Sequence, residues 1–485
     1  MSHRFTLPAE GVVPVPLCGE AVSGAESSQV RSPFDGSLLG AVPLLGATDV
    51  DRAVASATAA LHEAPLPVWR RVEVLERASA LLRERQEEFA QIIAHEAAKP
   101  IKTARVEAER AAGTFAFAAA EARKLSGEVI ALDAAPGADA KVAYTMRVPI
   151  GVVGAISPFN FPLNLVAHKV APAIAAGDPV VLKPAGQTPF SAIALAWLLV
   201  EECGLPASYL SVVTGPGRVV GNALVDHPDI ALITFTGSPE VGWAIKQQAP
   251  RKHVGLELGN NAPVIVAADG DWKKAADKIK IAGFSHAGQS CISTQRVLVH
   301  SSVADEFTEY LGSLVSTLVV GDPLDEATDV SSVISENERD RVKGWVDEAV
   351  AQGARIVAGG EIDGNGVLAP TVLADARPEM LVCIKEVFGP VVAVQAIDSV
   401  DEALKIANDT AYGLQAAIFT RDLSLAFAAV RALDFGGVLV NEVPTWRADQ
   451  MPYGGIRDSG NTREGPAYSI QEMTETRLVI IDTSA

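Results

Sequence analysis

Four short apolar segments, separated by stretches long enough to hold a helix, constrain the fold of this chain more than any other feature. They are residues 152–156, 179–182, 210–213 and 230–235. Apolar strands that alternate with helices are typical of a parallel sheet with helices on both faces. The sequence therefore predicts an α/β fold and, by analogy with other sheets of this kind, a nucleotide-binding one.

Helical segments precede these strands. The spacing of apolar residues within 48–127 predicts a helix that begins near residue 49 and a second helix over 71–98. Pro100 marks a break, after which a third helix is predicted over 101–126.

Strands and helices alternate again in the second half of the chain. This run comprises residues 263–267, 296–300, 307–318, 339–352, 392–396, 403–408 and 416–420. An exposed strand is predicted over 140–147 and an apolar terminal strand over 477–482. Because an unpaired apolar strand would be a sticky edge, we expect the terminal strand to pair with another subunit.

Charge and cysteine content exclude several classes of protein. The 485 residues carry 59 acidic and 40 basic side chains, a net charge of -19 that disfavours binding to nucleic acid or anionic membranes. The apolar region 150–182 is interrupted by prolines, which argues against a membrane span. Four scattered cysteines predict free thiols, and the N-terminal residues lack an export signal, so we expect a cytoplasmic protein.

Two residues carry the strongest chemical signal. Cys291 follows the glycine-containing segment 288–290, and a cysteine attacks carbonyl groups as a partly exposed thiolate. Glu257 lies in the apolar stretch 254–266, where burial would raise its pKa toward that of a general base. The alternatives are an inert buried thiol and a half-exposed acid at a strand end.

Turns that follow the predicted strands hold further candidates. Asn160, within 157–162, is placed to donate to an oxyanion, or it belongs to an ordinary turn. Lys183 ends a strand, where it would contact a ribose or phosphate or simply be solvated. The glycine loops 236–242 and 215–221 are weak phosphate-binding signals, and the second misses the GxGxxG spacing by one residue.

Taken together and in order, these segments resemble the aldehyde dehydrogenase superfamily. The matching segments, which extend over nearly the whole chain, are 157–162, 182–185, 235–238, 256–259, 288–291, 386–390 and 452–460. The members it resembles are NAD(P)-dependent and non-acylating, namely those that oxidise lactaldehyde, phosphonoacetaldehyde or, without phosphorylation, glyceraldehyde 3-phosphate.

The resemblance implies an aldehyde dehydrogenase fold with three parts. A Rossmann-like cofactor domain would comprise residues 1–127 and 148–256, and an α/β catalytic domain residues 257–450. Residues 128–147 and 470–485 would form a small bridging β-sheet that makes a homodimer or a homotetramer.

The resemblance also assigns roles within the site. Cys291 would be the nucleophile, Asn160 and the Cys291 N–H would form the oxyanion hole, and Glu257 would activate the water that hydrolyses the thioester. No metal is expected. Lys183 and Glu386 would hold the two riboses, Ser238 the pyrophosphate, and Phe388 would press on the nicotinamide end. The full set of cofactor-binding residues is Ile156, Ser157, Pro158, Phe159, Lys183, Ala185, Gly186, Gly217, Gly221, Phe235, Gly237, Ser238, Val241, Leu258, Glu386 and Phe388.

Three positions depart from the family pattern. Gly186 stands where many NAD-using members have an acidic residue that binds the adenosine ribose, so we expect NADP to be accepted as well as, or in place of, NAD. Phe159 replaces the commoner Trp, which is a mild change. Asn260 replaces a Gly and would alter how Glu257 moves.

Cations at the implied substrate tunnel suggest the substrate class. The predicted substrate residues are Arg110, Phe161, His168, Ser290, Ile292, Arg447 and Tyr453, with Arg105 and Trp446 as further neighbours. Cations in a pocket are costly unless they meet an anion, so we predict a small aldehyde bearing a phosphonate, phosphate, sulfonate or carboxylate.

Three alternatives remain open. Asp449 or Glu107 would pair with these arginines, and the substrate would then be a neutral hydroxyaldehyde such as lactaldehyde. A CoA-acylating enzyme is disfavoured because such members typically lack the carboxylate found here as Glu257. The last alternative is an inactive binding protein on the same scaffold.

Overall fold

The computed structural model describes residues 3–484, so residues 1, 2 and 485 of the predicted domain ranges lie outside the described residues. The first sheet has five parallel strands in the order β11-β10-β7-β8-β9. They are β7 (Val152–Ile156), β8 (Val180–Lys183), β9 (Leu210–Val212), β10 (Ile230–Thr236) and β11 (His253–Glu257). The order reverses between β7 and β10, which is where open parallel sheets bind ligands, at the carboxyl ends of their strands.

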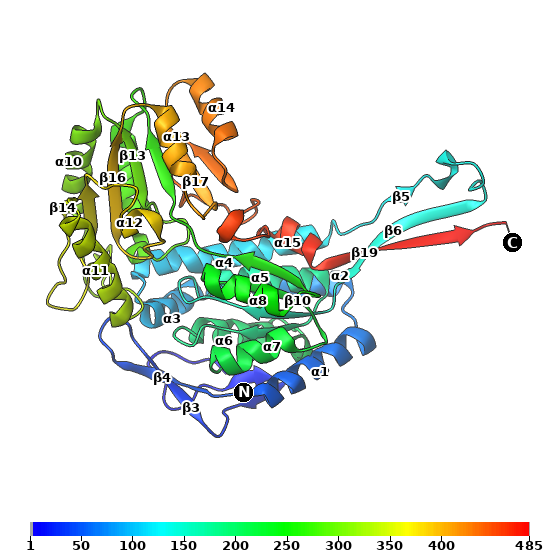
Figure 1. The fold of residues 1–485 in the computed structure, drawn as a ribbon. Helices are drawn as coiled ribbons and strands as arrows, with labels where there is room; N and C mark the ends of the chain where they lie inside the picture. The colour runs from blue at the N-terminus through cyan, green and yellow to red at the C-terminus, as the bar shows by residue number, and fades with distance from the viewer. Residues whose placement is uncertain (1–2, 485) are drawn as a thin grey trace.

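Helices pack on this sheet (Figure 1). Those that precede it are α1 (Ala47–Glu63), α2 (Val68–Glu84), α3 (Gln86–Ala97) and α4 (Ile101–Ala122); α5 (Asn164–Ala176), α6 (Phe190–Trp197), α7 (Asn222–Asp226) and α8 (Pro239–Gln248) connect its strands. The α2, α3 and α5 helices all contact α4.

The prediction of a single helix over 71–98 is wrong. The chain leaves helical geometry at Arg85, with φ -106° and ψ 23°, and forms two helices. Ion pairs with Glu88 and Glu202 hold the nearly buried guanidinium of Arg85 at this corner. Because apolar periodicity continues on both sides of the corner, the sequence pattern does not reveal the break.

The second sheet has seven strands in the order β14-β15-β16-β13-β12-β17-β18, all parallel except the β14–β15 pair. They are β12 (Pro263–Val266), β13 (Arg296–His300), β14 (Arg355–Ala358), β15 (Thr371–Ala374), β16 (Val391–Ile397), β17 (Gln415–Phe419) and β18 (Gly437–Val440). Its helices are α9 (Trp272–Ala282), α10 (Ala304–Val315), α11 (Glu336–Ala351), α12 (Leu381–Ile384), α13 (Val400–Asn408) and α14 (Leu423–Ala432). The predicted α/β fold is confirmed in both halves of the chain.

Two short hairpins near the N-terminus were not predicted. They are β1 (Val15–Leu17) with β2 (Glu20–Val22), and β3 (Ser27–Arg31) with β4 (Leu38–Pro43).

A three-stranded arm projects from the body of the molecule (Figure 1). It contains β5 (Val129–Ile130), β6 (Lys141–Pro149) and β19 (Thr474–Asp482), in the antiparallel order β19-β6-β5. The helix α15 (Pro466–Glu472) leads into β19 and packs on α4 and α5. The terminal strand therefore pairs with β6 of its own chain along one edge, and its other edge has no strand partner among residues 3–484.

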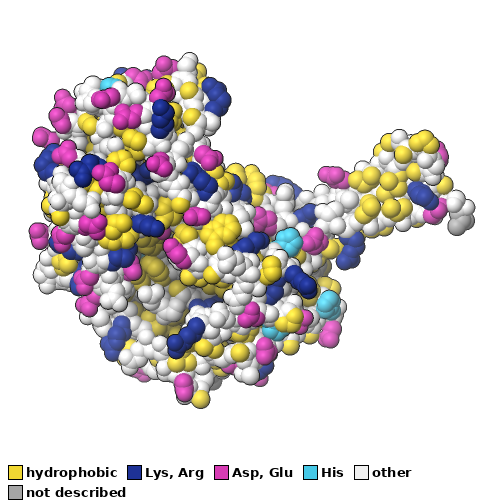
Figure 2. All heavy atoms as spheres, in the orientation of Figure 1, with side chains coloured by type: hydrophobic (Ala, Val, Ile, Leu, Met, Phe, Trp, Pro, Cys, Tyr) yellow, Lys and Arg dark blue, Asp and Glu magenta, His cyan; other side chains and the backbone are white. Residues whose placement is uncertain are grey.

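Apolar side chains remain exposed on the arm, as the space-filling view shows (Figure 2). Leu478 and Ile480 are each 54% exposed, and Val142 is 51% exposed. None of the described helices is both long and apolar enough to cross a membrane.

Candidate active site

A tight turn between α9 and β13 presents Cys291. His286 and Ala287 have φ values of 51° and 53°, and Gly288 follows with a φ of 71°. A Cβ atom added at Gly288 would lie 2.1 Å from the carbonyl oxygen of Gly389, so only glycine fits there. This left-handed run turns the chain toward a cavity.

The cavity beside Cys291 has a volume of about 230 Å³. The predicted substrate residues that line it with the cysteine are Arg110, Phe161, Ser290, Ile292, Arg447 and Tyr453. His168 does not line it, because its imidazole is buried behind Arg447, with Nε2 3.1 Å from Arg447 Nη2 and 3.0 Å from Asp449 Oδ1. Asn164 and His286 also line the cavity, and the sequence did not predict them as site residues.

Both cavity arginines have carboxylate partners. Arg110 donates to Asp449 from Nη2 at 2.7 Å and from Nε at 3.2 Å. Arg447 donates from Nη2 to Glu464 Oε2 at 2.8 Å. The predicted alternative of an Arg–Asp449 pair is therefore present, whereas Glu107 pairs with Lys99 and not with an arginine.

The prediction that Arg105 and Trp446 lie beside the tunnel is wrong. Arg105 lies on the surface and pairs with Glu87 and Glu326, so it does not face the cavity. Trp446 is 53% exposed and does not line the cavity either; the adjacent Thr445 does. Along a helix or an extended loop, a shift of one position changes the direction of a side chain, which the motif alignment does not specify.

Asn160 contacts the cysteine loop directly. Its buried amide donates from Nδ2 to the carbonyl oxygen of Gln289 at 2.9 Å, and Lys99 Nζ donates to the Asn160 carbonyl at 2.7 Å. The N–H of Cys291 has no acceptor among residues 3–484. The two oxyanion donors that the resemblance implied, the Asn160 amide and the Cys291 N–H, thus belong to two segments that contact each other.

The Cys291 thiol contacts a tyrosine. Its Sγ lies 2.8 Å from Tyr453 Oη. Burial raises the pKa of the thiol to about 12, while the hydrogen bond from Tyr453 and the charge of Arg447 act in the opposite direction.

Glu257 ends β11 with its carboxylate buried. The residue is 4% exposed, and neither oxygen has a hydrogen-bond partner among residues 3–484. Burial, followed by the neighbouring charge of Glu464, raises its pKa well above the usual range. Glu257 is therefore not a half-exposed strand-end acid, and its surroundings favour the protonated form of the carboxyl.

The predicted cofactor residues cluster where the strands of the first sheet end. Residues 156–159 end or follow β7, residues 183–186 end or follow β8, and residues 235–238 end or follow β10. Gly217 and Gly221 lie in the helical turn after β9, Val241 lies in the first turn of α8, and Leu258 follows β11.

The chemistry of this crevice fits a nicotinamide dinucleotide. Lys183 is 8% exposed and has no carboxylate partner among the described residues; Nζ donates only to the Pro184 carbonyl. Beside Gly186, an added Cβ atom would meet nothing within 4 Å. A buried, unpaired cation next to open space suits the hydroxyl or phosphate oxygens of a nucleotide.

The end of the crevice predicted to hold the nicotinamide contains Glu386 and Phe388, which precede β16 of the second sheet. Glu386 accepts a hydrogen bond from the Asn260 N–H at 3.0 Å, and burial raises its pKa to about 8. The rings of Phe159 and Phe388 meet edge to face, with centroids 5.8 Å apart. A carboxyl with unused acceptor sites and two adjacent rings fit a ribose and a flat heterocycle.

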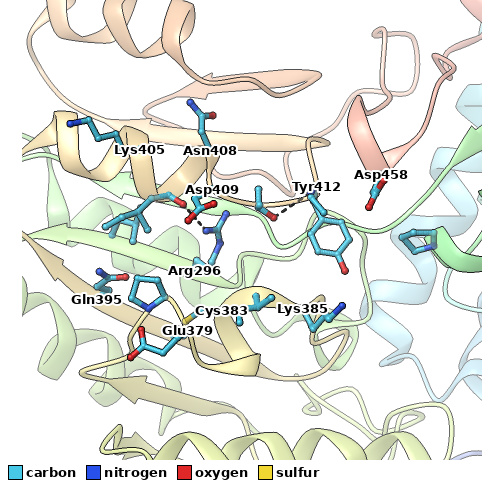
Figure 3. Close-up of a pocket in the computed structure, with 18 of the residues that line it drawn as sticks. Arg296, Glu379, Cys383, Lys385, Gln395, Lys405, Asn408, Asp409, Tyr412 and Asp458 are labelled. Carbon is cyan, nitrogen blue, oxygen red and sulfur yellow. Dashed lines mark hydrogen bonds between the residues drawn. The ribbon is translucent and has the colours of Figure 1, made fainter.

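A larger cavity of about 940 Å³ lies elsewhere, between the start of α8 and the α12 and α13 helices (Figure 3). Arg296, Lys385 and Tyr412 line it, but none of the predicted site residues does. The guanidinium of Arg296 donates to backbone carbonyl groups, so it is already used in the fold. No cluster of three metal-binding side chains occurs within residues 3–484.

A crevice whose chemistry fits a dinucleotide, beside a cavity with a free thiol, a buried carboxyl and an amide donor, is an arrangement typical of dehydrogenases that act through a cysteine. The model of the Aldehyde dehydrogenase family matches residues 21–479, and the chain belongs to that family. It is an NAD(P)-dependent oxidoreductase.

Relatives of the chain cover almost its full length. It is 46% identical to a 3-sulfolactaldehyde dehydrogenase of Priestia megaterium, over 96% of this chain and 97% of that protein. It is 38% identical to a lactaldehyde dehydrogenase of Methanocaldococcus jannaschii, over 94% and 97%. The structure resembles an NADP-dependent glyceraldehyde-3-phosphate dehydrogenase from Bacillus halodurans complexed with NADP, with a TM-score of 0.94, 37% identity and coverage of 99% and 100%.

Proposed function

We propose that this protein oxidises a small anionic aldehyde, bearing a sulfonate, phosphonate, phosphate or carboxylate group, to the carboxylic acid. The observation that carries the proposal is the pair of arginines, Arg110 and Arg447, in the cavity of Cys291. The relative named 3-sulfolactaldehyde dehydrogenase supports a sulfonate.

The carboxylate partners of the arginines leave donors for a ligand. Arg110 uses Nε and Nη2 for Asp449, and its Nη1 has no partner among residues 3–484. Arg447 uses Nη2, while its buried Nε has no partner in the same part of the chain. Asp449 therefore fixes one edge of the Arg110 guanidinium and Glu464 fixes one nitrogen of Arg447, and the remaining N–H groups would bind the anion of the substrate.

The chemistry would proceed through Cys291. The thiolate adds to the aldehyde carbon, a C–S bond forms, and the carbonyl electron pair moves to oxygen. The Asn160 amide and the Cys291 N–H would stabilise that oxyanion. NADP or NAD, when bound, supplies the hydride acceptor. Loss of a hydride from the same carbon leaves a thioester on Cys291.

Glu257 would then act as the base. It takes a proton from a water molecule whose oxygen attacks the thioester carbon. The C–S bond breaks, the carboxylic acid leaves, and the thiolate is restored. A buried carboxyl at Glu257 supports hydrolysis over transfer to CoA.

Lys183 and Glu386 would hold the two riboses, Ser238 the pyrophosphate and Phe388 the nicotinamide end. The open space at Gly186 supports acceptance of NADP, because no carboxylate there repels a 2′-phosphate. Residues 1–127 and 148–256 would form the cofactor domain, 257–450 the catalytic domain, and 128–147 with 470–485 the bridging sheet of a homodimer or homotetramer.

A neutral hydroxyaldehyde is the second candidate. The pairing of both arginines with Asp449 and Glu464 favours it, as does the relative named lactaldehyde dehydrogenase.

A panel of aldehydes separates the two candidates. Sulfonated, phosphonylated and carboxylated aldehydes and neutral lactaldehyde are assayed with NADP and with NAD, in the wild type and in Arg447→Leu. Loss of a charged hydrogen bond is expected to lower kcat/KM for the best anionic aldehyde by about 10- to 100-fold more than for lactaldehyde. The surface variant Arg105→Leu is the control. An equal effect of Arg447→Leu on both classes would contradict the proposal.

A further inference from the structure

We propose that Tyr453 is a catalytic residue whose hydroxyl donates a hydrogen bond to the Cys291 thiolate and stabilises it for attack on the aldehyde. This inference rests on the proposed role of Cys291 as the nucleophile.

The contact is direct and well fixed. Tyr453 Oη lies 2.8 Å from Cys291 Sγ, and Tyr453 is 3% exposed. Its backbone exchanges two hydrogen bonds with Glu464, from Tyr453 N at 3.1 Å and from Glu464 N at 2.6 Å. Apart from Cys291, the hydroxyl has no hydrogen-bond partner within residues 3–484. The phenol is therefore held with its hydroxyl oxygen at hydrogen-bonding distance from the sulfur of Cys291.

The direction of this hydrogen bond follows from the charge state. Either atom is a possible donor while the thiol is neutral, but only the hydroxyl has a proton once the thiol has ionised. Burial, followed by the neighbouring thiol, raises the pKa of Tyr453 well above its usual range, so the hydroxyl keeps its proton. The thiolate form of Cys291 thus has a neutral donor at hydrogen-bonding distance.

The thiolate needs this stabilisation. Burial opposes ionisation of Cys291, and the influences that favour it are the Tyr453 hydrogen bond and the charge of Arg447. Arg447 also lies over the Tyr453 ring, with Cζ 3.8 Å from the centroid. A cation on the ring face strengthens the phenol as a donor, so the two residues act on the sulfur in the same direction.

Glu464 joins both of these residues. Its carboxylate accepts from Arg447 Nη2, and its backbone pairs with that of Tyr453. One residue thereby sets the position of the guanidinium and of the phenol relative to the sulfur.

A merely structural Tyr453 would fill the cavity wall with its ring, and phenylalanine would serve equally well. The test is therefore Tyr453→Phe, which removes only the hydroxyl. Alkylation of Cys291 by iodoacetamide is followed as a function of pH, without aldehyde or cofactor, by mass spectrometry of the peptide that contains Cys291. Thermal unfolding verifies that the variant is folded.

We expect the apparent pKa of Cys291 to rise by about one unit and the alkylation rate at pH 7.5 to fall about tenfold in Tyr453→Phe. Tyr310→Phe is the matched control, because the Tyr310 hydroxyl contacts Asp277 on the surface at 3.1 Å. Arg447→Gln leaves the hydroxyl in place and is expected to shift the titration in the same direction. A titration curve of Tyr453→Phe that coincides with that of the wild type overturns the inference.

An error in the proposed function can be distinguished from an error in the role of Tyr453. If Cys291→Ala still oxidises aldehydes, the nucleophile is misassigned, whatever the titration shows. If oxidation requires Cys291 and the Tyr453→Phe titration is unchanged, only the role of Tyr453 is wrong.

Discussion

Glu257 shows how the surroundings of a single residue change its acidity. Its carboxyl is buried without a hydrogen-bond partner among residues 3–484, a placement that costs free energy and that proteins keep mainly where the group has a task. The raised pKa means that this carboxyl holds its proton more tightly than an exposed glutamate does.

Glu257→Gln is expected to retain the first turnover and lose steady-state activity by about 10²- to 10⁴-fold, because the thioester forms but is not hydrolysed. Stopped-flow absorbance of reduced cofactor would show a burst equal to the active sites, followed by a slow phase. The exposed Glu475→Gln serves as the control. Steady-state activity like that of the wild type would remove Glu257 from hydrolysis.

Gly186→Glu is expected to shift cofactor preference toward NAD. The added side chain has room, and its carboxylate would repel a 2′-phosphate while it accepts hydrogen bonds from ribose hydroxyl groups. We expect the Kd for NADP, measured by quenching of protein fluorescence, to rise about tenfold or more. Gly344→Glu also enters open space, on α11, and controls for added charge. An unchanged NADP affinity would show that position 186 does not face the adenosine ribose.

The carboxyl of Glu386 makes stability depend on pH. Its pKa in the folded protein is about 8, above the ordinary 4.5, so folding favours the protonated form. The stabilisation is complete below about pH 4.5 and is lost as pH rises toward 8. Between pH 6 and 8.5 the wild type is expected to lose roughly 2 kcal/mol of unfolding free energy relative to Glu386→Gln. Urea unfolding of both proteins without cofactor measures this difference, and a constant difference would contradict it.

At the scale of elements, a buried ion pair holds the segment of Asn160 in place. Lys99 follows α3 and Glu107 lies on α4; they pair, and both are almost fully buried. Lys99 donates to the Asn160 carbonyl, while Glu107 accepts from the N–H groups of Leu163 and Asn164 at 3.0 and 3.1 Å. The pair therefore fixes the start of α5 relative to α4.

Lys99→Met is expected to destabilise the protein by about 3–5 kcal/mol, because it leaves Glu107 charged and buried without its partner. Replacement of both residues, in Lys99→Met with Glu107→Gln, is expected to restore part of this loss. Chemical denaturation measures both effects. Lys102→Met breaks a more exposed pair with Asp329 and is expected to cost less than about 1 kcal/mol. Equal costs for the two single variants would refute this account of the buried pair.

Elements with a strong local pattern were predictable from the sequence, and those defined by distant partners were not. The apolar strands β7, β8 and β9 were found because each is buried throughout, and β10 was found because most of its residues are buried. The hairpins β1–β4 and the strands β14, β15 and β18 were missed; most are short, and some are partly exposed, so their apolar pattern is weak.

The same distinction applies to the site. Cys291, Glu257 and Asn160 each belong to a recognisable local segment. The contact between Cys291 and Tyr453 joins residues 162 positions apart, and the pairing of Arg447 with Glu464 depends on how a loop folds back. Periodicity and motif spacing contain no information about such contacts, which only the three-dimensional arrangement supplies.

At the scale of the whole molecule, the arm leaves a strand edge and apolar side chains uncovered among the described residues. The β19 strand has an edge without a strand partner in residues 3–484, and apolar side chains cover part of the arm (Figure 2). Exposed apolar edges of this kind favour pairing with a second chain.

Leu478→Asp combined with Ile480→Asp is expected to convert the assembled protein into monomers, because the charges would be buried in the interface. Size-exclusion chromatography with light scattering measures the mass. Leu423→Asp, at a 70% exposed position on α14, is the control. A wild type that is already monomeric would contradict the role of the arm.

The pairing of β6 with β19 also sets the order of events during synthesis. Lys141 contacts Asp482, 341 residues later in the chain. At about 5–20 residues per second, a ribosome would need roughly 17–70 s to make the second strand after the first. The nascent chain must therefore keep β6 shielded, by itself or with a chaperone, until β19 emerges from the ribosome. An arm that contains both strands can form only after residues 474–482 have been made.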